Sequence, residues 1–182
     1  MVRNKKTEGQ IQLYTGDGKG KTTAGLGLAL RAAGQGKKVA IIFFDKGGID
    51  YGERKSLLKL KPQVDFFVTG LVRFVPGKPF RFSVLPGDKE EAAKGLTLAR
   101  QLFKKNYDLI ILDEINTSVG LKMLPLPPVL KLLKAKPAKL EVVLTGRFAR
   151  PELLEQADLV TEMKMIKHYM FKGVPARLGI EY

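Results

Sequence analysis

A glycine- and lysine-rich run near the start of the chain, TGDGKGKTT over residues 15–23, constrains the fold more than any other feature. It follows a short apolar segment, residues 11–14, that is typical of a strand. It leads into residues 21–33, whose apolar side chains recur at helical spacing. A strand, a glycine-rich turn and a helix in this order are the setting of a phosphate-binding loop, in which backbone N–H groups surround phosphate oxygens. The run therefore predicts a nucleotide-binding P-loop.

The residue types within this loop match the tasks of a P-loop. Lys21 supplies a point charge to the phosphates, and the Thr22 hydroxyl can reach Mg²⁺. The strict pattern has glycine five positions before Gly20, where this chain has Thr15, so the loop departs from the pattern at one residue. The alternative, a Gly/Lys-rich loop that arose by chance, is disfavoured by the strand before it and the helix after it. The residues expected to contact the nucleotide are Gly16, Asp17, Gly18, Lys19, Gly20, Lys21, Thr22 and Thr23.

An apolar run that ends in two carboxylates supports the same site. Residues 109–112 read LIIL, and Asp113 and Glu114 follow directly. In P-loop proteins such a strand is expected beside the P-loop strand, where it delivers an acid to the metal region. Carboxylate oxygens are ligands that Mg²⁺ prefers, directly or through water. We therefore expect Thr22, Glu114 and Asp113 at a Mg²⁺ site. The alternative for Glu114 is an acid that merely favours the positive end of a helix.

Four apolar runs predict the remaining framework of a sheet. They cover residues 39–44, 64–68, 109–112 and 142–144, and they are continuous rather than alternating, which is typical of strands covered on both faces. Helical segments lie between them, as in a parallel sheet with crossover connections. We therefore expect an α/β protein with a P-loop nucleotide-binding (RecA-like) fold, a mostly parallel sheet flanked by helices. It forms a single domain over residues 1–182, with residues 1–9 as a flexible N-terminal tail.

Two helical segments carry more detailed expectations. In residues 21–33 the spacing places Leu26, Leu30 and Ala33 on one face, which we expect to pack on the core. Asp88, with Glu91 three residues later, predicts a capping box that opens a helix running to about residue 105.

One long stretch, residues 70–88, fits neither pattern. It contains three prolines, three glycines and several aromatic and basic side chains. Structureless loops of this length are uncommon in compact domains and often serve as lids or binding loops. The alternative is an edge strand or hairpin within its RFSVL segment, residues 81–85.

Composition excludes several kinds of site. The chain has no Cys and a single His, His168, which excludes a disulfide framework, a cysteine nucleophile and a multi-histidine metal site within one chain. No apolar run approaches the ~18–20 residues of a membrane span. The N-terminus, MVRNKKTEGQ, lacks the apolar stretch of a signal peptide. We therefore expect a cytoplasmic protein without membrane contact.

The charge balance is strongly basic. The 32 Lys and Arg residues against 18 Asp and Glu give a net charge of +14, which suggests an anionic partner such as a nucleotide, a nucleic acid or an acidic membrane surface. The basic residues are spread along the chain and form no run of five or more like charges. This spread is typical of a solvated, lysine-rich surface.

Beyond these motifs, the sequence resembles the ATP:corrinoid adenosyltransferases of the P-loop type, also called cob(I)alamin adenosyltransferases. The resemblance extends from residue 11 to residue 182, and that family replaces the first P-loop glycine in the same way. The segments that carry it read TGDGKGKTTAGLGLALRAAGQGKKV, LDEIN, VLTGR, ADLVTEMKMIKH and GVPARLGIEY.

The resemblance implies a reaction and a set of partners. The enzyme, a cob(I)yrinic acid a,c-diamide or cob(I)alamin adenosyltransferase, would transfer the 5′-deoxyadenosyl group of ATP to Co(I) of a reduced corrinoid and release triphosphate, in adenosylcobalamin formation or salvage. Co(I) is then the nucleophile, and no catalytic side chain is expected. ATP would lie reversed relative to most P-loop enzymes, with Gly16–Thr22 on the triphosphate and Thr22 and Glu114 on Mg²⁺. A homodimer and a flavoprotein reductant are also implied.

This chain departs from the family pattern on the corrinoid side. Family members carry Gly-Phe-x-Trp after the third strand, whereas this chain reads TGLVRFVPGKPF over residues 69–80 and has no Trp. Phe74 and Phe80 are the candidates for the aromatic role. Arg147 follows a predicted strand end, where α/β sheets place ligands, so a phosphate or ribose contact and a structural ion pair both remain open. For His168 a site role and a hydrogen-bonded structural role remain open.

Two other function classes compete with the transferase. One is a P-loop ATPase or kinase that acts on nucleic acid or a small substrate. The sequence has no clustered basic helix, no aromatic-and-basic RNA motif and no evident water-positioning residue, so a nucleic-acid partner is not expected. The other is a nucleotide-binding module without catalysis, which would not turn over ATP when reduced corrinoid is present.

Overall fold

A six-stranded sheet forms the centre of the protein, as seen in a computed structural model that describes residues 8–48, 51–73, 81 and 83–182. The strand order is β3-β2-β4-β5-β1-β6, and every pairing is parallel. The prediction of a mostly parallel α/β sheet is therefore confirmed. The strands are β1 (Ile11–Thr15), β2 (Val39–Phe43), β3 (Val64–Val68), β4 (Leu109–Asp113), β5 (Glu141–Thr145) and β6 (Leu159–Glu162).

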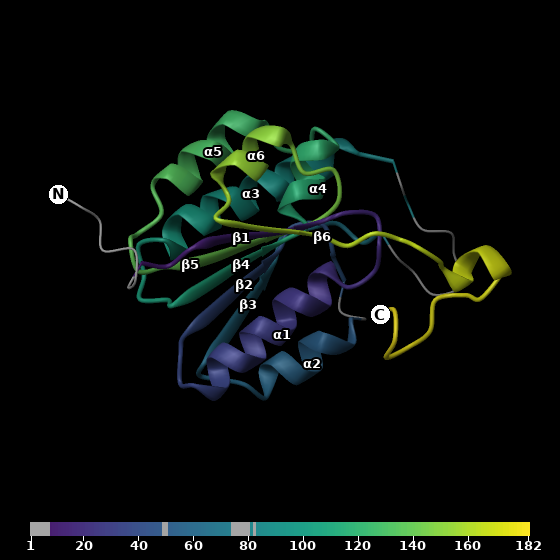
Figure 1. Cartoon of the computed structure of the whole chain (residues 1–182), viewed down its shortest axis with the longest axis horizontal. Coiled ribbons are helices and arrows are strands. Elements are labelled where there is room, and N and C mark those ends of the chain that lie inside the picture. The colour runs from purple at the N-terminus through teal and green to yellow at the C-terminus, as the bar shows by residue number, and fades with distance from the viewer. Residues whose placement is uncertain (1–7, 49–50, 74–80, 82) are drawn as a thin grey trace.

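Helices cover both faces of this sheet (Figure 1). One face carries α1 (Lys21–Gly34) and α2 (Gly52–Leu58), and the other carries α3 (Pro86–Leu102), α4 (Ile115–Gly120), α5 (Leu126–Lys134) and α6 (Pro151–Gln156). Two apolar clusters, one on each face, bury the continuous runs of β2 and β4, as expected for strands covered on both sides. Within the described part of the chain, no helix has the length and apolar character needed to cross a membrane.

The C-terminal segment leaves the body of the protein after β6. It carries a short 3₁₀ helix, η1 (Tyr169–Lys172), and lies beyond the ends of the central strands (Figure 1). Strand β6 itself reads LVTE and is exposed along its whole length. Its short, half-polar sequence carries no burial pattern, which is why the apolar runs did not predict it.

Helix α1 packs on the sheet mainly through small residues, with Leu26, Leu28 and Ala33 partly buried beside them. Gly25, Ala29 and Ala32 are buried, whereas the side chain of Leu30 is 59% exposed. Because these small residues bring the helix axis close to the sheet, larger side chains on either side of them reach only the edge of the apolar cluster. Of the predicted face, Leu26 and Ala33 therefore pack on the core as expected and Leu30 does not. The helix ends at Gly34, one residue later than predicted.

Helix α3 begins at Pro86, two residues before the predicted start, and ends at Leu102. Asp88 is therefore not the residue before the helix. It lies in the first turn, where its Oδ2 accepts a hydrogen bond of 2.7 Å from the backbone N–H of Leu85. Proline suits the first helical position because it needs no hydrogen bond there, which accounts for the earlier start.

Asp88 also holds two arginines from the segment before α3. Its carboxylate accepts two parallel hydrogen bonds from Arg81, at 2.7 and 2.8 Å, and lies 3.4 Å from the buried guanidinium of Arg73. The hydrogen bonds from Arg81 lower the pKa of Asp88. Arg73 in turn donates to the backbone carbonyls of Arg81 and Ser83. Asp88 thus joins the start of α3 to both sides of the preceding loop.

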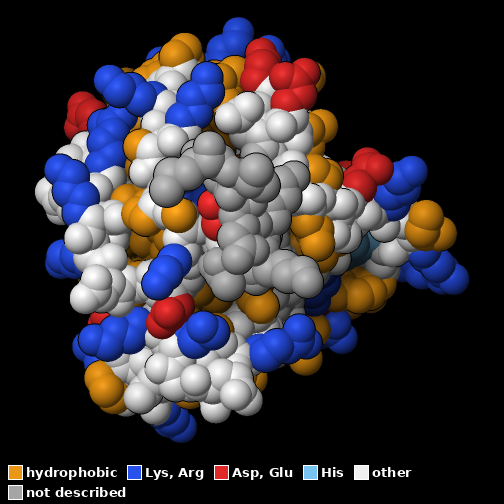
Figure 2. Space-filling view, turned by 60° about the vertical axis from the view of Figure 1, so that its left-hand side comes forward, with side chains coloured by type: hydrophobic (Ala, Val, Ile, Leu, Met, Phe, Trp, Pro, Cys, Tyr) orange, Lys and Arg blue, Asp and Glu red, His pale blue; other side chains and the backbone are white. Residues whose placement is uncertain are grey.

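The remaining sequence expectations have mixed outcomes. Gly9, assigned to the tail, donates to the Ala138 carbonyl at 2.8 Å and is therefore fixed to the body, while residues 1–7 lie outside the described part. Residues 81 and 83–85 form no strand, which disfavours the edge-hairpin alternative for them. Phe74 and Phe80 lie outside the described residues. Figure 2 shows Lys and Arg side chains scattered over the visible face with acidic side chains among them, as the even spread in sequence suggested.

We expect Asp88→Ala to lower the free energy of unfolding by roughly 3 kcal/mol, because it removes one partner of a buried ion pair. Glu91→Ala, which breaks the exposed Glu91–Lys94 pair, is the matched control and should cost less than about 1 kcal/mol. Since the folded pKa of Asp88 is depressed, its contribution should be full above the unfolded pKa and should shrink as the pH falls below about 4. Denaturant unfolding at two pH values measures both effects, and equal losses in the two variants would contradict the role of Asp88.

Candidate functional site

The carboxyl ends of the central strands bring together three segments that are far apart in sequence. β1 leads into the P-loop, β4 ends in Asp113, and β5 leads into the Thr-Gly-Arg segment, residues 145–147. One expectation is wrong here: β4 does not lie beside β1, because β5 pairs with both strands and separates them. Thr145, at the end of β5, therefore stands between the P-loop and the carboxylates. Ligand sites in open α/β sheets lie at this edge.

The P-loop is braced by the segment that follows β6. Gly18 N donates to the carbonyl of Met163 at 2.7 Å, and the backbone N–H of Met165 donates to Oδ1 of Asp17 at 3.0 Å, which lowers the pKa of Asp17. A Cβ at Gly16 would lie 2.4 Å from the Met163 carbonyl oxygen. Glycine is therefore required at Gly16 by the close approach of this backbone as well as by its φ of 100°.

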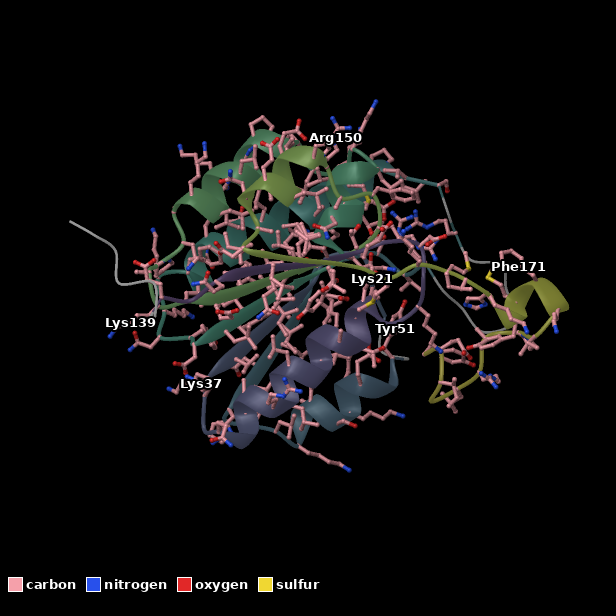
Figure 3. All side chains as sticks on the ribbon, in the orientation of Figure 1. Lys21, Lys37, Tyr51, Lys139, Arg150 and Phe171 are labelled. Atoms are coloured by element: carbon pink, nitrogen blue, oxygen red, sulfur yellow. The ribbon has the colours of Figure 1, made fainter. Side chains whose placement is uncertain are left out.

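Lys21 lies across the loop that would hold the phosphates, near the centre of the molecule in Figure 3. Its ammonium is buried and donates to the carbonyl of Gly18 at 2.6 Å, and burial lowers its pKa. Gly20, with φ of 121°, turns the chain into α1, whose first turn has no acidic side chain. The N–H groups and the positive end of the helix dipole therefore face the loop without an internal anion to neutralise them.

The two carboxylates after β4 have different surroundings. Asp113 is 1% exposed, and its Oδ1 accepts a hydrogen bond of 2.6 Å from the Thr145 hydroxyl. The same hydroxyl oxygen accepts from the backbone N–H of Glu114 at 3.0 Å. Glu114 has φ of 63°, an uncommon left-handed conformation for a residue with a side chain, and its carboxylate is partly exposed. Asp113 is thus enclosed, whereas Glu114 is available to a ligand.

A lysine that sequence reasoning missed, Lys46, joins the residues expected at the metal. Its Nζ donates to Oδ2 of Asp113 at 2.8 Å and to the Thr22 hydroxyl, and it lies 3.7 Å from Oε1 of Glu114. Burial alone would lower the pKa of Lys46, but the two carboxylates outweigh it and raise the pKa. Lys46 comes shortly after β2, the strand on the other side of β4. Its place at that strand end is the only signal in the sequence.

These donors fit a divalent cation. The Thr22 hydroxyl and the carboxylates of Asp113 and Glu114 converge on one positive charge, the Lys46 ammonium, which stands in for an ion. In the described part of the chain, no three His, Cys, Asp or Glu side chains are grouped so that they could hold a metal by themselves. Mg²⁺ commonly takes one or two protein ligands and completes its shell with phosphate oxygens and water.

The Thr-Gly-Arg segment orients Glu114 from the side of β5. Arg147 N donates to the Thr117 hydroxyl oxygen at 2.9 Å, and the Thr117 hydroxyl donates to Oε2 of Glu114. Gly146 has φ of 126°, and a Cβ there would lie 2.7 Å from Thr117 N. The Arg147 side chain is exposed, and its charge adds to the effect of burial in lowering the pKa of Lys21. The backbone of Arg147 therefore has a structural role, and its side-chain charge acts on the Lys21 ammonium of the P-loop.

The Lys19 side chain, expected at the phosphates, contacts the C-terminal segment instead. Its Nζ donates to Oε1 of Glu181 at 2.9 Å, to the Ile180 carbonyl at 3.0 Å and to the Tyr169 hydroxyl at 3.2 Å. Glu181 also accepts from Arg177, and hydrogen bonds from Arg177, Tyr169 and Lys19 lower its pKa. Lys19 thus fastens the C-terminal segment to the outer side of the P-loop.

The geometry of His168 supports the structural reading. Nδ1 accepts a hydrogen bond of 3.1 Å from the backbone N–H of Met170, which caps the start of η1, and the ring centroid lies 4.7 Å from that of Tyr169. These contacts account for a polar ring at this position without a ligand.

A buried arginine, Arg73, lies in the segment that follows β3. Arg73 is 3% exposed, and its Nε donates to Oδ1 of Asp45, the neighbour of Lys46 in the chain. Burial raises the pKa of Asp45 to about 6 despite this arginine. Residues 70–73 therefore join the β2 end of the site through an ion pair.

Comparison with known proteins shows which family the chain is similar to. A family model described as ATP:corrinoid adenosyltransferase BtuR/CobO/CobP matches residues 7–182. The chain is similar to a corrinoid adenosyltransferase of Escherichia coli (strain K12), with 38% identity over 176 residues that cover 96% of this chain and 86% of that protein. It is also similar to a corrinoid adenosyltransferase of Pseudomonas aeruginosa, with 34% identity over 183 residues that cover 100% of this chain and 88% of that protein.

Among solved structures, the chain is similar to the flagellar accessory protein FlaH from Methanocaldococcus jannaschii. The TM-score is 0.56 at 10% sequence identity, and the match covers 86% of this chain and 71% of that chain. This likeness shows a shared fold and nothing about the reaction.

We expect Thr145→Val to lower the free energy of unfolding by about 1–3 kcal/mol, because buried Asp113 loses a donor and Glu114 N loses its acceptor. Thr97→Val is the control, since the Thr97 hydroxyl lies on the exposed face of α3 and bonds only to the carbonyl of Ala93 in its own helix. It should change stability by less than about 0.5 kcal/mol. Denaturant unfolding of both variants checks the prediction, and a Thr145→Val protein as stable as the control would contradict it.

Proposed function

The chain belongs to the ATP:corrinoid adenosyltransferase family, and we propose that the carboxyl ends of β1, β4 and β5 form its ATP site. The enzyme is a transferase that moves the adenosyl group of ATP to the cobalt of a reduced corrinoid. A P-loop ATPase or kinase, the competing hypothesis from sequence, is not favoured, because the family match spans residues 7–182.

The observation that carries the site assignment is the convergence of the P-loop and the β4 carboxylates on one cation. The glycines of the loop and the start of α1 offer N–H groups to the triphosphate. Lys21 adds a positive charge, whose attraction to a phosphate is stronger in a site shielded from water. Lys21 now rests on a neutral carbonyl, that of Gly18, which a phosphate oxygen can replace. The contacts proposed for the triphosphate run from Gly16 to Thr22, with Thr23 exposed in the first turn of α1.

In the proposed reaction the chain holds the leaving group. Co(I) donates an electron pair to the 5′ carbon of ATP, a cobalt–carbon bond forms, and the carbon–oxygen bond breaks with its electron pair on the departing triphosphate. Because cobalt is the nucleophile, no side chain has to be deprotonated. Lys21 and the loop N–H groups stabilise the negative charge that develops on the triphosphate, and they position the 5′ carbon toward the corrinoid.

Thr22 and Glu114 are the residues that would hold Mg²⁺, and Asp113 would orient the site from its buried position. When bound, the metal neutralises part of the triphosphate charge. The Thr117 hydroxyl fixes Glu114 toward this point, and the Thr-Gly-Arg segment fixes Thr117. Arg147 is then available to a phosphate or to the ribose.

The other partners are proposed from the resemblance. A flavoprotein reductant would supply Co(I), and a cytoplasmic location would go with it. A homodimer is further supported by the C-terminal segment, where Ile166, Phe171 and Leu178 are 89%, 72% and 74% exposed, since apolar side chains gathered in one segment suit an interface. The aromatic role on the corrinoid side is assigned to Phe74 or Phe80.

We expect Lys21→Ala to weaken ATP binding more than tenfold, because a charge-assisted contact of roughly 1.5–3 kcal/mol is lost. Lys37→Ala is the matched control: Lys37 is exposed and lies at the opposite end of the sheet from Lys21 (Figure 3). Calorimetric titration with Mg-ATP measures both affinities. A Lys21→Ala protein that binds ATP like the control and still adenosylates corrinoid would show that the P-loop assignment is wrong.

The product tests the proposed reaction directly. If the carbon–oxygen bond breaks, inorganic triphosphate should accumulate in step with the adenosylated corrinoid, and added triphosphate should inhibit because it occupies the same N–H groups. The assay mixes the protein with Mg-ATP and chemically reduced cobalamin, follows the light-sensitive cobalt–carbon bond by absorbance, and resolves the anions by chromatography. ADP formed in proportion to turnover, independent of corrinoid, would instead identify an ATPase.

A further inference from the structure

Lys46 occupies a position that the proposed metal also requires. Its ammonium lies within hydrogen-bond distance of Thr22 and Asp113 and 3.7 Å from Glu114, and these are the residues expected around Mg²⁺. The side chain of Lys46 is 17% exposed, so little water shares the space. Two cations repel each other strongly at such a distance in a partly buried site. Lys46 and Mg²⁺ therefore cannot hold these oxygens at the same time.

Neighbouring residues hold the backbone of Lys46 in place. Arg54 donates to the Lys46 carbonyl, and its guanidinium lies 5.3 Å from the ring centroid of Phe43 and 4.8 Å from that of Tyr51. The next residue, Gly47, donates to the Leu71 carbonyl at 3.2 Å. A fixed Cα with a flexible four-carbon stem lets the ammonium move several ångströms without moving the chain.

The charge balance gives this movement a direction. Without nucleotide, the Lys46 ammonium offsets the carboxylates of Asp113 and Glu114, of which Asp113 is 1% exposed. A buried carboxylate that loses its cation is strongly destabilised unless another cation replaces it. A divalent cation replaces the ammonium and more than balances its loss, and a triphosphate beside Thr22 offers the displaced ammonium an anionic acceptor of higher charge.

We propose that Lys46 is a further triphosphate-binding residue. In the nucleotide-free protein its ammonium holds the metal-binding oxygens together. When Mg²⁺ takes this place, the Lys46 side chain moves and its ammonium contacts the triphosphate. The inference rests on the proposed function, because it uses the metal site of Thr22, Asp113 and Glu114. Lys46 would thus be a third kind of phosphate contact, besides the loop N–H groups and Lys21. It comes from the end of β2, whereas the P-loop follows β1 on the other side of β4. Lys46 contacts the leaving group, and the site changes cations as the substrate binds.

The test uses Lys46→Gln, which keeps a hydrogen-bond donor beside Asp113 and removes the charge. In the nucleotide-free protein, Mn²⁺ affinity measured by electron paramagnetic resonance should rise about tenfold or more, because no ammonium competes for the oxygens. Binding of inorganic triphosphate with Mg²⁺, measured by calorimetry, should weaken about tenfold, because a charge-assisted contact is lost. Lys94→Gln, at an exposed position on α3, is the control and should change neither value.

The outcomes separate this proposal from the metal assignment. An unchanged Mn²⁺ affinity or an unchanged triphosphate affinity in Lys46→Gln overturns the exchange, and so does triphosphate binding by the unaltered protein that is insensitive to EDTA. Glu114→Gln, added to Lys46→Gln, should abolish the gained Mn²⁺ binding. If it does not, the metal lies elsewhere and the site assignment fails together with the exchange. Lys46→Met, which has no donor, should repeat the Mn²⁺ result if the charge is what competes, and a Met variant with unaltered Mn²⁺ affinity overturns the proposal.

Discussion

The buried carboxylate of Asp113 imposes the constraint around which the rest of the site is arranged. An ionised group at the end of a central strand, covered on both faces, is tolerated only when charge and hydrogen bonds satisfy it. The Thr145 hydroxyl serves one oxygen and the Lys46 ammonium serves the other. The strands that supply these partners, β5 and β2, flank β4 on its two sides. Asp113 therefore sets the relative positions of three strand ends. Glu114 is the next residue, so its position is set as well.

The features that sequence predicted are local, and those that it missed depend on segments meeting in space. A short segment of sequence is enough to recognise the P-loop, the buried strand β4 and the acids after it. The hydrogen bond from Gly18 to Met163 joins residues that no sequence pattern connects. Nothing in the sequence distinguishes Lys46 from the other lysines, because only the pairing of β2 with β4 brings it to the site. The small residues of α1 show a related limit, because spacing identifies a helix but the closeness of packing decides which side chains reach the core. For a site built from the ends of several strands, the sequence therefore predicts the acidic residues and the loops. It does not predict the residues that orient them.

The ion pair of Arg73 with Asp45 links the segment after β3 to the end of β2, beside the proposed nucleotide site. Asp45 and Lys46 are neighbours at the end of β2, and their side chains point to different partners: Asp45 to Arg73, and Lys46 to Asp113. Arg73 also reaches Asp88 at the start of α3. A buried arginine paired with two carboxylates is costly to disturb, because removal of either partner leaves a charge uncompensated. The segment after β3 is thus tied by charge to the residue beside Lys46.

Three lysines lie in or beside the P-loop, and each donates to a different kind of acceptor. They differ in whether that acceptor would be left as an unpaired charge when the lysine moves to a triphosphate. Lys21 rests on a neutral carbonyl, so its exchange to a phosphate oxygen leaves no charge behind. Lys46 rests on carboxylates, so in the proposed exchange its release requires a replacement cation, Mg²⁺. Lys19 rests on Glu181, which Arg177 also neutralises, so Lys19 can leave without isolating that carboxylate. In the proposed exchange, Lys21 therefore needs no replacement cation and Lys46 needs one, whereas release of Lys19 loosens the C-terminal segment from the loop.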